Sequence, residues 1–503
     1  MAPQGQRDSL GAGEHAERPL RWPLVNQLQA RNPDLPLSKD ARLYNCYAEY
    51  DSEDKEYWVY KRLGLSTTPY YSAPVAATGL GTYTETGGGS VFSVFGSQLL
   101  AGASVLGTVN ANGPYTWETL GPAGQSSRQV VLQNGSVGYY ISFTSGPISV
   151  PFLTTITDPN FPSATAVPGL VNLDGYLYVM DTSGNIWGST TVNSAATWSA
   201  LDFIKASSNA DLGVALNKQL SYIVALKQYS TQVFYDAGNA PPGSALSPVP
   251  DVQIPLGCLH GNSVQSVDNS MLWLTSNQTI SPQVVQMDNL VPKIVSTPAV
   301  ERILDNISWF SMQLGVRSWV LKHGGHRFYF LTVIALNITL VYDLDQQLWY
   351  IWTDYQGNYW PIVAASFVEP FEGGTDGIHL AQHISNGNIY QMDGDYEYPN
   401  DYGNLFPVDI YTPNMDFGTI RRKMLTGMYF RADRTPNSFL QARYTDDDFS
   451  SWSNFRTIDL SKRKPRMMNC GTFVQRRAYH FRHLCNTSFR IKTIDLALQV
   501  GTI

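Results

Sequence analysis

The chain has 503 residues, of which 15% are charged and 12% aromatic, and its formal net charge is −7. This length allows two or three domains with a large core, and the four widely spaced cysteines exclude a disulfide-rich scaffold and fit a reducing compartment. The charge is uneven, because residues 1–400 carry 32 acidic and 18 basic side chains whereas residues 401–503 carry 9 and 16, so an acidic body precedes a basic tail domain.

Residues 1–40 are rich in Gly, Pro, Arg and Gln and show no hydrophobic period, so we expect an extended N-terminal arm. The first residues contain no apolar run of the kind found in secretory signals. The nearest approach to a membrane segment, Phe328 to Tyr342, is about 15 residues long and is interrupted by polar residues, which is too short to span a bilayer. We therefore expect no membrane embedding.

Short apolar runs separated by turn signals recur over residues 41–405 and predict an all-β body. Two segments follow the same strand, turn, strand pattern, and a third gives half of it: VNLDGYLYVMDTSGNIW (171–187), ITLVYDLDQQLWYIW (338–352) and GNIYQMD (387–393). Such units, repeated about every 50 residues, are typical of the blades of a β-propeller.

The 338–352 hairpin also predicts how its strands are covered. Strand alternation places Leu348, Tyr350 and Trp352 on one face and Trp349 and Ile351 on the other, so both faces are apolar. A hairpin of a β-sandwich usually buries one face, whereas a propeller blade is packed between two others. We therefore predict a β-propeller body and keep a β-sandwich as the alternative.

The chain also contains short segments that resemble those of a known family in both order and spacing: RLYNCYAE (42–49), KRLGL (61–65), TWSALDFIKAS (197–207), TQVFYDAGN (231–239), IPLGC (254–258), STPAVERIL (296–304), GHRFYFLT (325–332) and LVYDLDQQLWYIW (340–352). This series resembles the packaged-DNA stabilisation proteins of short-tailed bacteriophages, the podoviruses, which form the hub or nozzle of the tail. The segment TGLGTYTETGGGS (78–90) departs from the family pattern because it is richer in Gly and Thr.

The resemblance implies a virion structural protein with a β-propeller body and no enzymatic activity. It implies a homohexameric ring below the portal and its head-to-tail adaptor, through which double-stranded DNA is held and later ejected. Tail fibres, a tail spike or a needle are the further partners it implies, with the virion tail as location and the host cytoplasm during assembly.

Residues 406–503 predict an additional C-terminal β-sandwich-like domain. In YTDDDFSSWSNFRTIDL (444–460) we expect a hairpin in which a carboxylate caps a tight turn and the Trp packs beneath it. The alternative is a metal or acid/base cluster at Asp446, Asp447 and Asp448, but consecutive residues point in different directions and cannot easily share one ion.

Basic residues of this domain are the candidate contact site for assembly or for DNA: Arg421, Arg422, Lys423, Lys462, Arg463, Lys464, Arg466, Arg476 and Arg477. A basic groove with interleaved aromatics would bind nucleic acid. However, in a strand Arg476 and Arg477 would point to opposite faces, which divides the charge between surfaces. Protein docking against acidic neighbours is therefore favoured over DNA contact.

No cofactor, metal or catalytic site is expected. Gly79-Leu80-Gly81 begins a dinucleotide fingerprint, but Thr84 stands where the third Gly belongs and no helix is predicted to follow. The alternative function is a propeller-type glycan hydrolase or a receptor-binding tail protein, and the hydrolase would need a carboxylate pair about 5–10 Å apart.

Overall fold

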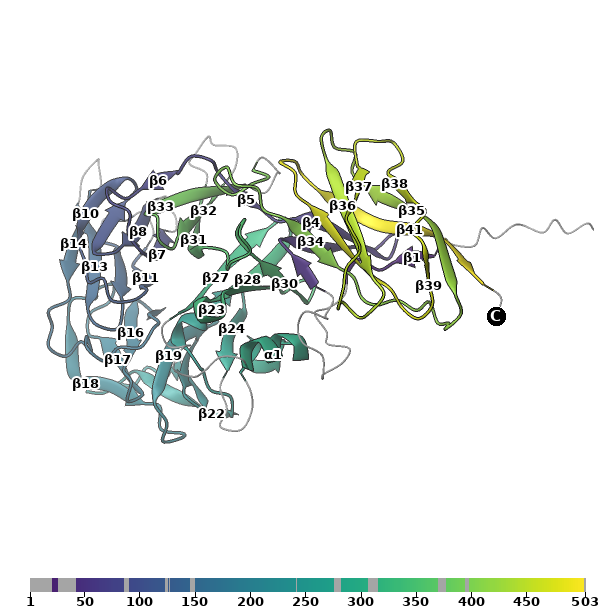
Figure 1. Cartoon of the computed structure of the whole chain (residues 1–503). Coiled ribbons are helices and arrows are strands. Elements are labelled where there is room, and N and C mark those ends of the chain that lie inside the picture. Colours follow the sequence, from purple (N-terminus) through teal and green to yellow (C-terminus); the bar gives the residue numbers. More distant parts are fainter. Residues whose placement is uncertain are drawn as a thin grey trace, which may run out of the picture.

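The computed structural model shows an all-β chain with a propeller and a sandwich lying side by side, on the left and right of Figure 1. The structure describes residues 20–25, 42–85, 90–122, 125, 127–144, 150–240, 242–275, 282–305, 315–369, 377–393 and 398–501.

Five of the propeller sheets are four-stranded antiparallel meanders, in which each strand pairs with the next in the chain. Their strands are β7 (Gly79–Thr84), β8 (Val91–Phe95), β9 (Gln98–Ala101) and β10 (Ser104–Thr108); β11 (Thr116–Leu120), β12 (Gln129–Gln133), β13 (Gly138–Phe143) and β14 (Pro151–Thr155); β15 (Val171–Leu173), β16 (Tyr176–Met180), β17 (Asn185–Ser189) and β18 (Trp198–Lys205); β19 (Gly213–Gln219), β20 (Tyr222–Lys227), β21 (Thr231–Asp236) and β22 (Leu246–Ile254); and β23 (Gln265–Val267), β24 (Ser270–Thr275), β25 (Gln283–Asp288) and β26 (Val291–Ile294).

Two more sheets complete the ring. The sixth begins with β27 (Val316–His323), β28 (His326–Val333), β29 (Ile338–Asp343) and β30 (Leu348–Trp352). The seventh consists of β31 (Ile362–Val368), β32 (Ile378–His383) and β33 (Asn388–Asp393), and it is completed by β5 (Gly64–Leu65) and β6 (Tyr71–Ser72), which precede the first blade in the chain. Because β31 lies beside β7, these seven sheets close into a circle, and residues from the start of the propeller fasten its last blade.

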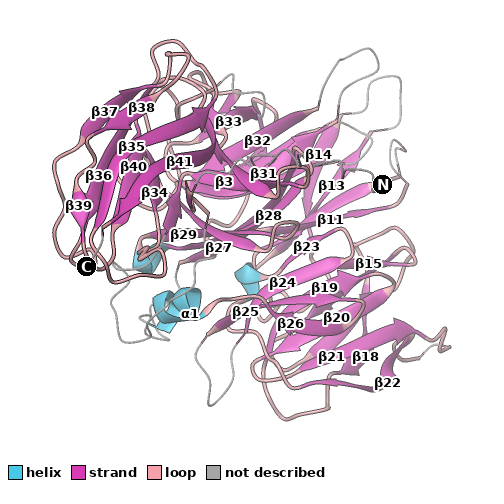
Figure 2. Ribbon diagram, turned by 90° about the vertical axis from the view of Figure 1, so that its right-hand side faces the viewer, coloured by secondary structure: helices cyan, strands magenta, loops and turns pink. Residues whose placement is uncertain are grey.

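The sandwich is built from both ends of the chain. One sheet contains β3 (Cys46–Asp51), β4 (Glu56–Lys61), β41 (Arg490–Val500), β35 (Lys423–Ala432) and β38 (Arg466–Met468), with β1 (Arg21–Trp22) beside β41 and β39 (Thr472–Phe473) beside β35. The other contains β2 (Arg42–Tyr44), β34 (Val408–Tyr411), β40 (Ala478–His483), β36 (Phe439–Thr445) and β37 (Arg456–Asp459). Figure 2 shows these strands beside the propeller blades.

Propeller and sandwich share one sheet. Strand β2 pairs in parallel with β30 of the sixth blade through Tyr44 and Ile351, and antiparallel with β34 of the sandwich. The result is a single nine-stranded sheet that runs from the propeller into the sandwich. One buried apolar cluster accordingly joins Phe330 and Trp352 of the blade to Tyr47 and Phe481 of the sandwich.

The strand pairing divides the chain differently from the expected boundaries of 41–405 and 406–503. Strands β2 to β4 belong to the sandwich, because their partners β30, β34 and β41 lie some 300 to 430 positions later in the chain. Of the expected arm, residues 1–40, only 20–25 are described, and there Trp22 is buried with its ring 4.8 Å from that of Tyr479. The rest of the arm lies outside the described residues.

The predicted hairpin at 338–352 is confirmed as β29 and β30. Leu348, Tyr350 and Trp352 lie in the cluster that continues into the sandwich, and Trp349 and Ile351 lie in a second cluster with the fifth blade. Both faces of the hairpin are therefore buried, as its two apolar faces predicted.

A recurring turn explains why several blade strands reverse where they do. After β16 the carboxylate of Asp181 accepts the backbone N–H groups of Ser183 and Asn185, each at 2.9 Å, and the indole N–H of Trp187 at 3.0 Å. Asp354 caps the equivalent turn after β30 and accepts the N–H groups two and four residues later, both at 2.8 Å. A carboxylate at the first position thus replaces backbone partners in a turn too tight to supply them.

Helices are few in the part of the chain that the structure describes. It contains the α-helix α1 (Pro298–Asp305) and the 3₁₀ turns η2 (Gly261–Ser263) and η3 (Ile334–Leu336). None of these has the length and apolar character that a membrane-crossing helix requires.

Candidate functional site

The propeller axis holds a cavity of about 360 Å³. Each of the seven sheets, or the segment leading into it, contributes residues to its wall: 79–83, 114–118, 168–170, 216–217, 261–266, 317–319 and 363–365. The Gly79-Leu80-Gly81 segment is therefore part of an inner strand. A Cβ on Gly81, whose φ is +145°, would lie 2.9 Å from the Trp117 indole nitrogen, so close packing accounts for this glycine.

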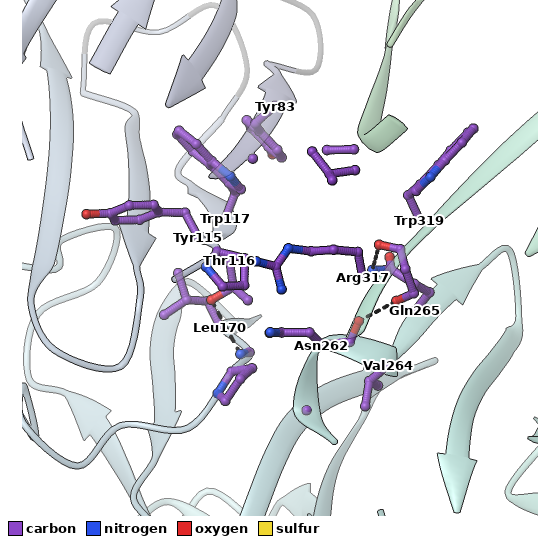
Figure 3. A pocket seen from close by; sticks show the side chains of 18 of the residues that line it. Tyr83, Tyr115, Thr116, Trp117, Leu170, Asn262, Val264, Gln265, Arg317 and Trp319 are labelled. Atoms are coloured by element: carbon purple, nitrogen blue, oxygen red, sulfur yellow. Dashed lines mark hydrogen bonds between the residues drawn. The ribbon is translucent and has the colours of Figure 1, made fainter. Parts of the chain in front are cut away.

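Two side chains bring charge to the cavity wall. Arg317 on β27 is the only cationic residue among the described residues that line the cavity, and in Figure 3 its side chain extends from β27 toward Thr116 on β11. Glu118 on β11 is the only carboxylate in this described part of the lining, and burial raises its pKa to about 7. Sequence reasoning missed both residues, because no local pattern distinguishes an inner-strand position from any other strand position.

The size of the cavity decides whether DNA can use it. A sphere of 360 Å³ is about 9 Å across, which is narrower than the roughly 12 Å of the major groove of a duplex alone. Double-stranded DNA therefore does not fit along the axis of a single propeller.

The predicted basic contact residues are spread over the sandwich and do not form one patch. Arg421 and Arg422 precede β35, whereas Arg466 on β38 pairs with Tyr429 near the far end of β35. Seven residues of strand separate these two places, which is about 23 Å. The exposed members of the predicted set are Arg421, Arg422, Lys462, Arg463, Lys464, Arg466 and Arg476, and the last of these is paired with Asp448.

Lys423 and Arg477 must be removed from that set, because both are buried. The Lys423 ammonium donates to the backbone oxygens of Val474 and Gln475 at 2.6 and 3.0 Å, and burial lowers its pKa. Arg477 forms a two-pronged ion pair with Asp446, with N–O distances of 2.6 and 2.7 Å. Both basic side chains therefore stabilise the interior of the domain.

The acidic run at 446–448 is divided among separate roles. Asp446 pairs with Arg477, and Asp448 pairs with Arg476. Asp447 caps the turn by accepting the Ser451 N–H at 2.9 Å, and this hydrogen bonding holds the pKa of its carboxyl at about 2. Trp452 packs below, with its ring 5.7 Å from that of Phe449. The predicted turn with a packed Trp is confirmed.

Propeller and sandwich carry opposite charge. Residues 64–393 contain 20 Asp plus Glu and 9 Lys plus Arg, a net charge of −11, whereas residues 401–503, which supply most of the sandwich strands, have a net charge of +7. The two ends of the molecule in Figure 1 are therefore electrostatically complementary to each other.

Comparison with solved structures finds only distant similarity in fold. The chain aligns with PorZ of Porphyromonas gingivalis at 10% identity and TM-score 0.37, over 64% of this chain and 37% of that one. It aligns with Chaetomium thermophilum Raptor at 12% identity and TM-score 0.40, over 66% of this chain and 29% of Raptor. It aligns with the N-terminal domain of Nup159 at 10% identity and TM-score 0.37, over 70% of this chain and 98% of that domain. The alignments thus span well under half the length of PorZ and Raptor. No curated protein sequence matches the chain.

Comparison with protein families gives a match over the propeller, apart from the short strand β5. Residues 69–393 match the family described as bacteriophage P22 Gp10, beta-propeller, and this range begins just before β6 and ends with β33. The chain therefore belongs to the P22 Gp10 family of phage packaged-DNA stabilisation proteins.

Proposed function

We propose that this chain is the tail nozzle of a podovirus, a ring of six copies below the portal and its adaptor. In this role it closes the head, retains the packaged DNA and forms the channel for ejection. Membership of the family makes it a phage virion structural protein that stabilises packaged DNA, and the match over residues 69–393 is the observation that carries the proposal.

The axial cavity supports a channel formed between copies instead of within one. Because a duplex does not fit along the propeller axis, a DNA channel requires several subunits arranged around it. The opposite charges of propeller and sandwich favour contacts of the basic domain of one copy with the acidic propeller of the next, and head-to-tail contacts of this kind can close into rings.

The acidic propeller also suits the handling of DNA. Each Lys or Arg engaged with a phosphate adds affinity, so a basic channel would hold DNA and slow its exit. A propeller of net charge −11 offers a surface that binds DNA weakly and allows it to slide.

A glycan hydrolase is the second candidate, and the cavity gives it little support. Most glycosidases use two carboxylates on either side of the scissile bond. Among the residues that line the described cavity, Glu118 is the only one with a carboxylate. A receptor-binding tail protein is the other alternative.

The proposal is tested by imaging the purified full-length chain with and without portal–adaptor complexes. We expect closed six-fold rings with a central channel to assemble below the adaptor. Monomers that never join the adaptor would contradict the nozzle, and monomers that degrade a host capsular polysaccharide would establish the hydrolase. The same complexes, incubated with tail fibre, spike or needle proteins, test those partners.

A further inference from the structure

Arg317 is a cation in the propeller cavity, and no described residue forms an ion pair with it. It lies on the innermost strand of the sixth blade, and its Nη1 donates to the backbone oxygen of Val316 at 2.9 Å. Its Nε is buried and has no hydrogen-bond partner within the described part of the chain. Buried polar groups are rarely left in this state, so each exception calls for a specific explanation.

The fully buried arginines of the described chain show how the fold satisfies a guanidinium in its interior. Arg62 is paired with Asp401, Arg128 with Glu85, and Arg477 with Asp446. A buried charge that lacks such a partner is strongly destabilising. Arg317 is only partly buried, and its side chain lies in the cavity wall without such a partner among the described residues.

Glu118, the one carboxylate of the cavity wall, does not fill this role. Its carboxylate accepts the N–H of Thr119 at 3.0 Å, and its cationic neighbour is Lys218. Burial brings its pKa to about 7, so near neutral pH it carries only part of a charge. Among the described residues, Tyr359 is the titratable neighbour that favours the charged form of Arg317.

The surroundings of Arg317 leave room for a ligand. The next inner strand, β31, faces the cavity with the short side chains of Ala364 and Ala365. Asn262 and Gln265 offer polar groups on one side, and Tyr83 and Trp117, stacked with their ring centroids 5.9 Å apart, form an aromatic wall on the other (Figure 3). A cavity of about 360 Å³ is at the lower end of the range found for small-molecule sites.

We propose that the axial cavity is a binding site for a small oxyanion, held by the Arg317 guanidinium. The ligand is a carboxylate or phosphate carried by a molecule no larger than a monosaccharide. Arginine suits both groups, because its planar fork donates two parallel hydrogen bonds to either. The site is separate from the surfaces proposed for ring assembly, so it can be tested on the isolated subunit.

Isothermal titration calorimetry of the full-length chain provides the test, with inorganic phosphate, D-glucuronate and the neutral sugar D-glucose as probes. We expect one of the two anions to bind with one site per chain and D-glucose to bind at least tenfold more weakly. Phosphate alone would identify a phosphate site, and glucuronate alone a sugar-acid site. If neither anion binds, or if glucose binds as well as glucuronate, the proposal is wrong.

Two variants locate the binding. Arg317→Gln should weaken the anion roughly 10- to 100-fold, because it removes charged hydrogen bonds. Lys322→Gln is the matched control, since Lys322 lies on the same strand but is exposed and outside the cavity, and it should bind as the wild type does. If Arg317→Gln does not fold, Arg317→Lys keeps the charge without the fork and should still bind less tightly. Unchanged affinity in a folded Arg317 variant would overturn the assignment.

Discussion

The guanidinium of Arg62 and the carboxylate of Asp401 form a two-pronged ion pair, with N–O distances of 2.9 and 2.5 Å, in which both side chains are buried. The remaining N–H groups of Arg62 donate to the Asn45 side chain and to the backbone oxygens of Leu63 and Thr353, so all five are used. Because these residues come from the sandwich, the sixth blade and the strand that closes the seventh, the pair joins the three parts of the fold at one point.

Removing one partner of this pair should destabilise the whole chain. Arg62→Ala leaves Asp401 charged and buried, and we expect a loss of about 3–5 kcal/mol in the free energy of unfolding, measured by chemical denaturation. Arg431→Ala is the control, because its pair with Asp495 is half exposed and should contribute less than about 1 kcal/mol. Equal losses in the two variants would show that burial of the Arg62 pair has no special role.

The second prediction concerns the aromatic core of the sixth blade. Trp349→Ala and Trp352→Ala should each lower stability by about 3–5 kcal/mol and reduce solubility, because both side chains are buried, on opposite faces of one strand. Tyr355→Ala, a nearby exposed aromatic, should change the thermal midpoint little. A soluble tryptophan variant with an unchanged midpoint would contradict the packing.

Acid should weaken the seventh blade through His383. Its Nδ1 accepts the backbone N–H groups of Ser385 and Asn386 at 3.1 and 3.3 Å, which requires a neutral ring, and burial lowers its pKa to about 4. Since the ordinary pKa is about 6.5, the unfolded chain binds the extra proton between these values. The contribution of His383 is therefore complete above pH 6.5 and is lost as the pH falls toward 4, by up to about 3 kcal/mol.

His383→Asn tests this pH dependence. The amide oxygen of Asn can cap the same turn, as Asp181 and Asp354 do in other blades, but it does not titrate. We expect near wild-type stability at pH 7 and a smaller loss at pH 4.5, measured by denaturation at both values. If the variant loses as much stability on acidification as the wild type, another group causes the loss.

Charge reversal of the exposed basic residues 462–466 distinguishes protein docking from DNA contact. Replacing Lys462, Arg463, Lys464 and Arg466 with Glu should prevent tail assembly on filled capsids, because these side chains would face acidic neighbours. Electron microscopy of complemented phage lysates gives the readout. Complete tails that leak DNA would show instead that these residues contact DNA. Reversal of Lys205 and Lys293, which are exposed on the propeller, serves as the control.

The local sequence pattern predicts the hairpins, but it does not predict the distant strands with which they pair. The alternation of Ile338 to Trp352 predicted a hairpin covered on both faces, because that information lies within 15 residues. Strands β2 to β4 look like any blade hairpin in the sequence, and only pairing with β34 and β41 places them in the sandwich. Pairing over such a separation leaves no local signal.

The same limit applies to the charged residues. Arg476 and Arg477 were expected to point apart, and one is exposed while the other is buried. Burial of Arg477 and Lys423 depends on partners such as Asp446 and the Val474 carbonyl, which the fold brings to them. No sequence pattern marks Arg317, because its position in the cavity wall depends on the geometry of the propeller axis.

The closing of the propeller by β5 and β6, together with the pairing of β2 to β4 with the C-terminal strands, has a consequence for synthesis on the ribosome. Strand β4 can pair with β41 only after about 430 further residues have been synthesised. Their translation takes roughly 20–90 s. Until then Leu43, Cys46 and Tyr47, which are buried in the complete fold, lack their cover. We therefore expect a prematurely terminated chain to expose the outer edge of this apolar hairpin and to aggregate or be degraded.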